Sequence, residues 1–398
     1  MKFLLVFVFL CSPLIGREKT PLIYLSWHED PTSTMTVRWI TDKKDTNDHL
    51  AYRLVSQDKK TPSWIEVVGH HSALPEKHPH TLHRVELQGL SPNTMYQFRV
   101  GKSDRLFRFK TMPQNLDEPV RFVVGGDAHG SSIKLFRAMS KQAAKAKPRF
   151  AIVGGDIAYS QPSSSSKKKE NFSRWRDFFK TWMQEMVDED GCLIPMFTAI
   201  GNHEVLGRYH RTAKQAPLYY AFFARSPTKC YYDFGFGWYA HFIFLDSGHT
   251  APVKGKQADW LKGILKKHKT FKHRFAIYHV GAYPSNGDAS KRIPKDIRKY
   301  WVPHFEKYHI NACFEHHDHA YKRTHPLING RKKSGGIVYF GDGSWGVQPR
   351  KPNPKRSYLA HSAESQQVIV VELRNDKRLF WSIDPKGKIL DTYEQKVE

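Results

Sequence analysis

The chain contains few cysteines, no long apolar run beyond its start, and a deficit of acidic residues. Only four of its 398 residues are cysteine. Cys11 lies in the apolar start, so Cys192, Cys230 and Cys313 allow at most one internal disulfide. Cys313 lies in an apolar stretch typical of a core strand. A Cys192–Cys230 pair is therefore the favoured bridge, and three free thiols fit the sequence as well.

No run of 18 or more apolar residues follows the N-terminus, so we expect no membrane-spanning helix. The chain begins with Met1 and Lys2, continues with the apolar segment 3–10, and is then interrupted by Ser12, Pro13 and Gly16. This order predicts a signal peptide over residues 1–16, with a buried first strand as the alternative. We therefore expect a secreted or periplasmic protein.

Acidic residues number 38 against 63 lysines and arginines, which gives a formal net charge of +25. Such a surface concentrates anions. We expect a small phosphorylated substrate and non-specific attraction to an anionic polymer or lipid surface, although general solubility explains the charge equally well. The charge is spread along the whole chain without a compact nucleic-acid motif, so no specific nucleic acid is predicted. The sequence does not indicate an oligomeric state.

Residues 20–113 alternate between apolar and polar side chains, with turn residues between the runs. The pattern predicts an all-β sandwich. Its expected strands are Thr34–Ile40, Leu50–Ser56, Trp64–Val68, Leu82–Leu87, Met95–Val100 and Leu106–Lys110. Five histidines of this part are expected to be solvated rather than to bind metal: His70, His71, His78, His80 and His83.

From residue 119 to 398, apolar strands alternate with helical segments, which predicts an α/β domain with four layers in the order α/β/β/α. The runs 133–147 and 172–187 have helical spacing. The strands include 121–124, 150–153, 196–200 and 275–278, and the run 380–384 is expected to be the last strand. In such sheets ligands bind beyond the carboxyl ends of the strands.

Short polar clusters begin where several of these strands end. They bring together two carboxylates, one amide, several imidazoles and a phenol: Asp127 and His129, Asp156 and Tyr159, Asn202 and His203, His279, and His317 and His319. Oxygen and imidazole donors suit iron, zinc or manganese, and the lack of thiolates argues against a structural zinc ribbon. Two such cations close together clamp the oxygens of an in-line displacement at phosphorus. Phosphate ester hydrolysis is therefore the leading hypothesis.

The order GDxH, GDxxY, GNHE, a lone histidine and HxH resembles the calcineurin-like metallophosphoesterases. The GDxxY variant, preceded by a fibronectin type III-like module with Trp39 and the Tyr96 corner, resembles the purple acid phosphatases. The resemblance implies that Asp127, Tyr159 and His319 bind a first metal, that Asp156 bridges, and that a second metal has three further ligands: Asn202, His279 and His317. Iron paired with zinc or manganese is the implied cofactor.

Two positions depart from the family pattern. His129 stands where the purple enzymes have glycine, so His129, Tyr159 or both would bind the first metal. Glu315 and His316 precede the last motif, and His316 is expected to lie beside the ligands rather than to coordinate.

The implied reaction is in-line attack of a metal-bound hydroxide on a phosphate monoester. His203, kept protonated by Glu204, would act as general acid and face the phosphate. Arg323 would bind the substrate phosphate or form a structural salt bridge. The loop 341–346 is expected to line the same site. A phosphodiesterase acting on nucleotides or lipid head groups, and an inactive secreted module that binds anionic surfaces, are the alternatives.

Overall fold

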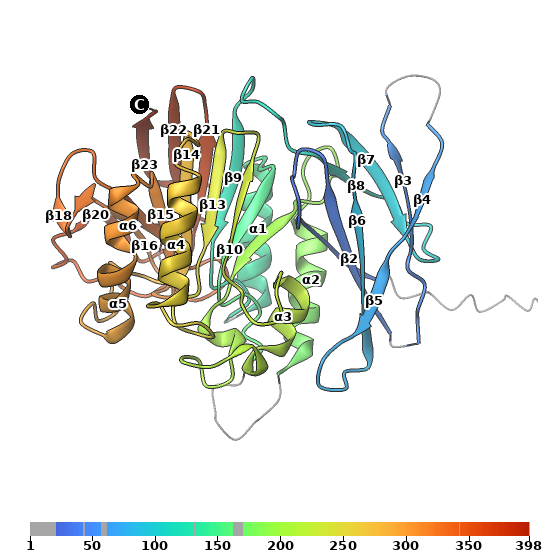
Figure 1. Ribbon diagram of the computed structural model, residues 1–398, viewed down its shortest axis with the longest axis horizontal. Coiled ribbons are helices and arrows are strands. Elements are labelled where there is room, and N and C mark those ends of the chain that lie inside the picture. The colour runs from blue at the N-terminus through green and yellow to red at the C-terminus, as the bar shows by residue number, and fades with distance from the viewer. Residues whose placement is uncertain are drawn as a thin grey trace, which may run out of the picture.

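The computed structural model of the chain describes residues 21–42, 44–56, 62–130, 132–161, 170–341 and 343–397. The predicted signal peptide lies outside the described residues. Figure 1 shows a β-sandwich packed against one side of a layered α/β domain. Within the described ranges, no helix is both long and apolar enough to cross a membrane.

The sandwich consists of two four-stranded antiparallel sheets with the orders β1-β2-β6-β5 and β4-β3-β7-β8. Its strands are β1 Leu22–Ser26, β2 Met35–Asp42, β3 His49–Leu54, β4 Ile65–Val68, β5 His70–Ala73, β6 His80–Leu87, β7 Met95–Val100 and β8 Phe107–Lys110. All six strands expected from the alternation are present. The expectation missed β1 and β5. All four β5 side chains are exposed, so this strand has no apolar alternation.

The sandwich core is formed by inward-facing side chains such as Val37, Trp39, Leu50 and Phe98, all of them buried. The Tyr96 hydroxyl accepts a hydrogen bond of 2.9 Å from the backbone N–H of residue 91, which fixes the turn before β7. This contact is the tyrosine corner that the sequence motif around Tyr96 predicts.

The α/β domain contains two mixed sheets. The first has the order β11-β10-β9-β21-β22-β23 and the second β12-β13-β14-β15-β19-β16-β20. The first sheet is made of β9 Val120–Gly125, β10 Phe150–Gly154, β11 Met196–Ala199, β21 Val368–Leu373, β22 Lys377–Ile383 and β23 Ile389–Lys396. The second is made of β12 Tyr232–Phe236, β13 Ala240–Phe244, β14 His273–Val280, β15 Ala312–His316, β16 Tyr321–Thr324, β19 Val338–Gly341 and β20 Leu359–Ala363. A two-stranded ribbon, β17 Leu327–Ile328 and β18 Arg331–Lys332, lies beside it.

The two sheets pack face to face through aromatic side chains. The Phe122 ring of β9 lies 5.2 Å from Phe242 of β13 and 5.7 Å from Phe275 of β14, between ring centroids. The outer faces are covered by two groups of helices (Figure 1): α1 Ile133–Lys145 and α2 Phe172–Glu185 on the first sheet, and α4 Lys256–Lys267, α5 Arg292–Tyr300 and α6 Val302–Lys307 on the second. The expected four-layer α/β/β/α core is confirmed.

The sandwich contacts the α/β domain through α2 and β11. The Tyr24 ring stacks on Phe179 of α2 at 4.4 Å, and Trp27 stacks on Phe197 of β11 at 5.2 Å. The aromatic side chains of α2 expected to be core are buried: Trp175, Phe178, Phe179 and Trp182. The expectation that 380–384 is the last strand was wrong, because β23 follows and pairs with β22.

Several parallel strands end at one rim. The pairs β9–β10, β10–β11, β13–β14, β14–β15 and β15–β19 are all parallel. The segments after β9, β10, β11 and β15, and the end of β14, therefore meet at the carboxyl edge, where ligands bind in sheets of this kind.

Candidate metal centre

Asp127, Tyr159 and His319 form one group at the rim. The Tyr159 hydroxyl donates to Asp127 Oδ1 over 2.9 Å, and His319 Nε2 lies 2.9 Å from the same oxygen. Tyr159 Oη and His319 Nε2 are 3.1 Å apart. The other carboxylate oxygen, Asp127 Oδ2, accepts the backbone N–H of His317 over 3.0 Å. The structure therefore brings together the three side chains that the family resemblance gives to a first metal.

A second group contains Asp156, Asn202, His279 and His317. His279 Nε2 lies 3.2 Å from Asp156 Oδ2 and 3.2 Å from Asn202 Oδ1. His317 Nδ1 lies 3.3 Å from the same imidazole nitrogen. One donor atom from each of Asp156, His279 and His317 lies within 4.8 Å of the others. His317 joins the two groups, because its backbone contacts Asp127 and its ring contacts His279.

The protonation states of the ionisable side chains in the two groups depend on one another. Burial raises the pKa of the Asp127 and Asp156 carboxyls, but neighbouring imidazoles outweigh it, and both pKa values fall below the usual range. Burial acts against protonation of His279, yet Asp156 and Asp127 raise its pKa to about 10. In His317, burial and the charge of His279 lower the pKa to about 4. Two buried carboxylates thus attract positive charge to the space between them.

Five residues of these two groups have left-handed backbone conformations. The φ values are 56° at Asp127, 51° at Asp156, 51° at Tyr159, 80° at His317 and 58° at His319. Such conformations cost non-glycine residues roughly 1–3 kcal/mol each and concentrate at functional sites. They lie in the segments that follow β9, β10 and β15, which meet at the rim.

The glycine pairs before the two aspartates admit the imidazole of His316. A Cβ atom on Gly154 would lie 1.9 Å from His316 Nε2, and one on Gly126 would lie 2.8 Å from the same ring. His316 is buried, and burial lowers its pKa to about 3. It lies beneath the two aspartate turns, as expected for a residue beside the ligands. Gly155 has φ 93° and a Cβ there would meet His279.

His203 lies at the solvent side of the second group, in the 3-10 turn Asn202–Glu204. Its backbone N–H donates to Asp156 Oδ1 over 2.7 Å, and its Nε2 lies 3.9 Å from Asp156 Oδ2. The ring stacks on Tyr159 at 4.2 Å. The side chain is 23% exposed, against 1% for Asp156 and none for His279. Burial lowers the pKa of His203, although Asp156 acts in the opposite direction.

His129 does not join either group by any contact in the described chain. Its ring stacks on Phe136 of α1 at 6.1 Å, and among the described residues neither ring nitrogen has a hydrogen-bond partner. Burial and Arg174 lower its pKa to about 4. Of the two first-metal candidates, Tyr159 is the one that the structure brings to Asp127.

Arg323 and Glu204 have other partners than expected. Arg323 Nε and Nη2 donate to the two carboxylate oxygens of Asp391 over 2.6 and 3.1 Å, which is the structural salt bridge of the sequence analysis. Glu204 accepts backbone N–H groups of Ile157 and Gly201 over 2.8 and 3.1 Å. Glu204 therefore fixes the turns that carry the site, and its expected contact with His203 is replaced by these backbone hydrogen bonds.

The loop 341–346 lines the site, as expected. A Cβ on Gly343 would lie 2.0 Å from Asp127 Oδ2, and the N–H of Gly346 donates to the Asp127 carbonyl over 2.9 Å. Asp342 lies outside the described residues. Cys192, Cys230 and Cys313 are buried free thiols, so the favoured Cys192–Cys230 bridge is not formed.

The sequence analysis missed three residues beside the second group. The Tyr209 hydroxyl donates to Asn202 Oδ1 over 3.4 Å, and its ring stacks on the buried His249 at 5.1 Å. Arg208 is exposed and close enough for its charge to contribute to the lowered pKa of His203. Arg208 and Tyr209 follow the GNHE motif closely, and only that place could have singled them out, whereas His249 lies after β13 and has no pattern of its own.

The donor set fits two metal ions. It contains two buried carboxylates, one amide oxygen, three imidazoles and a phenol, which together suit borderline and hard first-row cations. His317 connects the two groups, and each group offers at least three donors. Asp156 and Asp127 influence one another electrostatically, which indicates that the two positions are adjacent.

Two family models match the chain. The model of the N-terminal domain of purple acid phosphatases matches residues 21–111, and the model of calcineurin-like phosphoesterases matches residues 120–321. The chain belongs to the calcineurin-like phosphoesterase family. It is a purple acid phosphatase-like member and a metal-dependent phosphoesterase, and membership implies a binuclear metal centre.

Curated relatives of this phosphoesterase include plant enzymes. It is 24% identical over 396 residues to probable purple acid phosphatase 20 of Arabidopsis thaliana, covering 92% of this chain and 88% of that one. It is 26% identical over 292 residues to purple acid phosphatase 15 of the same plant, covering 66% of this chain and 53% of that one. The phosphoesterase thus spans about half the length of the latter relative.

Solved structures share the fold of this phosphoesterase. Purple acid phosphatase PPD1 from yellow lupin (Lupinus luteus) seeds has a TM-score of 0.76 and 15% identity, covering 94% of this chain and 73% of that one. PhoD has a TM-score of 0.68 and 13% identity, covering 97% of this chain and 94% of that one. At these identities the likeness concerns the fold alone.

Proposed function

We propose that this phosphoesterase hydrolyses phosphate monoesters, in the manner of an acid phosphatase. The observation that carries the proposal is the meeting of two metal-ligand groups, joined by His317, with a partly exposed imidazole beside them. The curated relatives named as purple acid phosphatases support it. The proposed substrate is a small phosphorylated molecule.

The first ion would be held by Asp127, Tyr159 and His319, and the second by Asn202, His279 and His317, with Asp156 shared between them. When bound, a pair of ions supplies Lewis-acid stabilisation of phosphoryl oxygens and activation of water. We propose iron together with zinc or manganese, because a phenolate ligand favours iron(III) and imidazole suits the divalent ions. Replacing Tyr159 with Phe would then remove a visible charge-transfer band, which an absorbance scan measures.

His203 is the proposed proton donor. Its Nε2 would give a proton to the leaving oxygen of the ester. The ring is held for this role from two sides, by the stack on Tyr159 and by the backbone hydrogen bond to Asp156. Its side chain is 23% exposed, more than the 12% of His319, so a substrate entering from solvent can reach it directly.

Arg208 is the proposed steering cation, in place of Arg323. Arg323 is neutralised by Asp391, whereas Arg208 is exposed and close to His203. A phosphate dianion that approaches His203 would enter the field of Arg208, which raises its local concentration. We also propose export of the protein, on the basis of the N-terminal segment of the sequence.

The test compares two dye substrates on metal-loaded full-length protein. We expect p-nitrophenyl phosphate to be hydrolysed with a higher kcat/KM than bis(p-nitrophenyl) phosphate. The reverse order would replace the proposal with the phosphodiesterase alternative. Hydrolysis of neither substrate by protein that carries two ions would favour the inactive binding module.

A further inference from the structure

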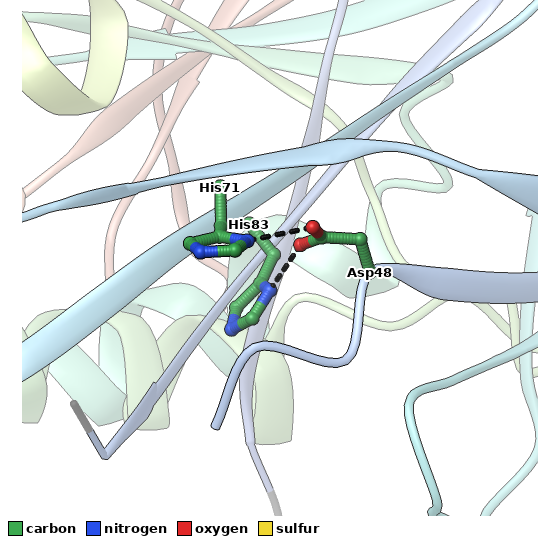
Figure 2. Close-up of side chains that lie close together, drawn as sticks. All are labelled: Asp48, His71 and His83. Atoms are coloured by element: carbon green, nitrogen blue, oxygen red, sulfur yellow. Dashed lines mark hydrogen bonds and ion pairs between the residues drawn. The ribbon is translucent and has the colours of Figure 1, made fainter. Parts of the chain in front are cut away.

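The sandwich contains a separate group of potential metal ligands, far from the catalytic residues in the sequence. His71 of β5 and His83 of β6 are direct register partners in an antiparallel pair. Asp48 precedes β3, in the opposite sheet of the sandwich. Figure 2 shows both imidazoles pointing toward the Asp48 carboxylate. Three segments from two sheets therefore place three metal-binding side chains together.

The distances within the group are short. His71 Nδ1 lies 2.6 Å from Asp48 Oδ2, and His83 Nδ1 lies 2.7 Å from Asp48 Oδ1. One donor atom from each of the three residues lies within 4.8 Å of the others. Each imidazole therefore directs the same ring nitrogen, Nδ1, to a different oxygen of one carboxylate.

The ring of His83 is held rigidly. It is fully buried and stacks on Trp39 with an interplanar angle of 3° and a centroid distance of 4.9 Å. Its Nε2 lies 2.7 Å from the Thr41 hydroxyl. The second ring nitrogen is therefore held by a hydrogen bond, as is common for histidine ligands of metals.

The two imidazoles bring one ring nitrogen each to a single carboxylate inside the sandwich. Imidazole nitrogen and carboxylate oxygen are donor types that first-row cations bind. A cation that enters the group would therefore contact all three side chains.

The position of Asp48 is fixed and one side of the group is open. The Asp48 carbonyl accepts the backbone N–H of Gly69 over 3.0 Å, which ties it to the segment between β4 and β5. The exposed fractions of the side chains are 13% for Asp48 and 35% for His71. A water molecule can reach the group from the His71 side and complete a tetrahedral set of ligands.

We propose that Asp48, His71 and His83 bind one zinc ion that links the two sheets of the sandwich. Two imidazoles and a carboxylate are a common ligand set for this ion. The ion would connect the edge strand β5 to the segment that enters β3. It would stabilise the sandwich by mass action, since the unfolded chain does not hold the three side chains together.

The test measures zinc bound to the full-length protein after dialysis against zinc and then against zinc-free buffer. We expect His71→Gln to contain one zinc ion fewer per chain than the unchanged protein, with equal turnover of a phosphatase dye. Zinc should raise the unfolding temperature less in this variant. Asp48→Asn should give the same loss, and it uses a second position that does not touch Trp39.

The matched control is His70→Gln, which changes the adjacent exposed histidine of the same strand. We expect it to retain the zinc content of the unchanged protein. Equal zinc content in His71→Gln and the unchanged protein would overturn the proposal, and so would an equal loss in His70→Gln. Unchanged dye turnover shows that a loss of zinc does not come from the catalytic centre or from misfolding.

Discussion

The imidazole of His316 fills the space into which a side chain on Gly154 would extend. This relationship connects the last residue of β15 to the last residue of β10 and fixes the turn that carries Asp156. The close approach explains why glycine precedes the turns that carry Asp127 and Asp156. It also gives His316 a role in shaping the site without coordinating an ion.

Replacing Gly154 with Ala should destabilise the protein and lower turnover. The new methyl group would lie 1.9 Å from His316 Nε2, and overpacking of this kind costs about 1–3 kcal/mol. Denaturant unfolding and dye hydrolysis measure the two effects. The control is Gly263→Ala in α4, where nothing lies within 4 Å of the added Cβ. That change should leave turnover unaltered, and equal behaviour of the two variants would refute the steric argument.

Replacing Asp156 with Asn should remove metal and activity together. The carboxylate is buried and contacts His279 and His203. As the proposed shared ligand, it would supply negative charge to both ions. We expect binding of both ions to weaken and turnover to fall by at least about 10³-fold, since the ions would supply the activation of water. Metal analysis and dye hydrolysis check this. Asp288→Asn, at a fully exposed carboxylate, is the control; metal retention in Asp156→Asn would contradict the shared-ligand role.

Replacing His203 with Ala should spare the metals and lower turnover by roughly 10²–10⁴-fold on an alkyl phosphate. On p-nitrophenyl phosphate the loss should be smaller, because nitrophenolate leaves without a proton. Comparing kcat for the two esters separates proton donation from a structural role. His210→Ala, at an exposed histidine of the same loop, is the control. The same loss on both esters would argue against His203 as the acid.

Replacing Arg208 with Ala should raise KM about fivefold with little change in kcat, which corresponds to roughly 1 kcal/mol of lost attraction. The effect should shrink at high salt, since an exposed charge is screened. Arg323→Ala should instead leave KM unchanged and lower stability, because the Asp391 carboxylate would lose its ion pair while keeping the hydrogen bond from the Tyr321 hydroxyl. Steady-state kinetics at two ionic strengths distinguishes the roles, and a KM effect confined to Arg323→Ala would reverse our assignment.

Glu170 should make stability fall as pH rises. Burial raises the pKa of this carboxyl from 4.5 to about 7 in the folded chain, against hydrogen bonds from Leu218 and Ser160. The unfolded chain releases the proton first, so the folded state loses about 3 kcal/mol between pH 4.5 and 7. Glu170→Gln stays neutral and should lack this loss. Unfolding at pH 5 and pH 8 measures it, and parallel pH profiles of the two proteins would refute the raised pKa.

The meeting of the polar clusters in the candidate metal centre could be predicted because most of them follow an apolar strand, and the ends of parallel strands meet. The sequence also contained enough apolar spacing to predict the sandwich and the layered domain. The sequence did not predict exposed strands such as β5 and β23, because each pairs with only one neighbouring strand and buries little side-chain surface. The family fold and activity followed from the order of the motifs rather than from any one of them.

Side-chain partners that are distant in sequence could not be predicted. The pairing of Arg323 with Asp391 spans 68 residues and depends on how β23 of the first sheet packs against β16 of the second. The sequence analysis grouped His83 with the histidines expected to be solvated, yet its ring is buried against Trp39 beside Asp48. The sequence also did not determine which groups the His129 ring contacts, because its place in the GDxH motif does not fix its side-chain rotamer.

The positive φ angles at Asp127, Asp156, Tyr159, His317 and His319 limit how this chemistry could be transplanted. Copying the same residues onto a different scaffold would not reproduce the site, because an unsupported loop relaxes to ordinary backbone angles. The donor atoms would then point in different directions. A transplanted site would also need the flanking strands and the His316 imidazole that packs beneath the two aspartate turns.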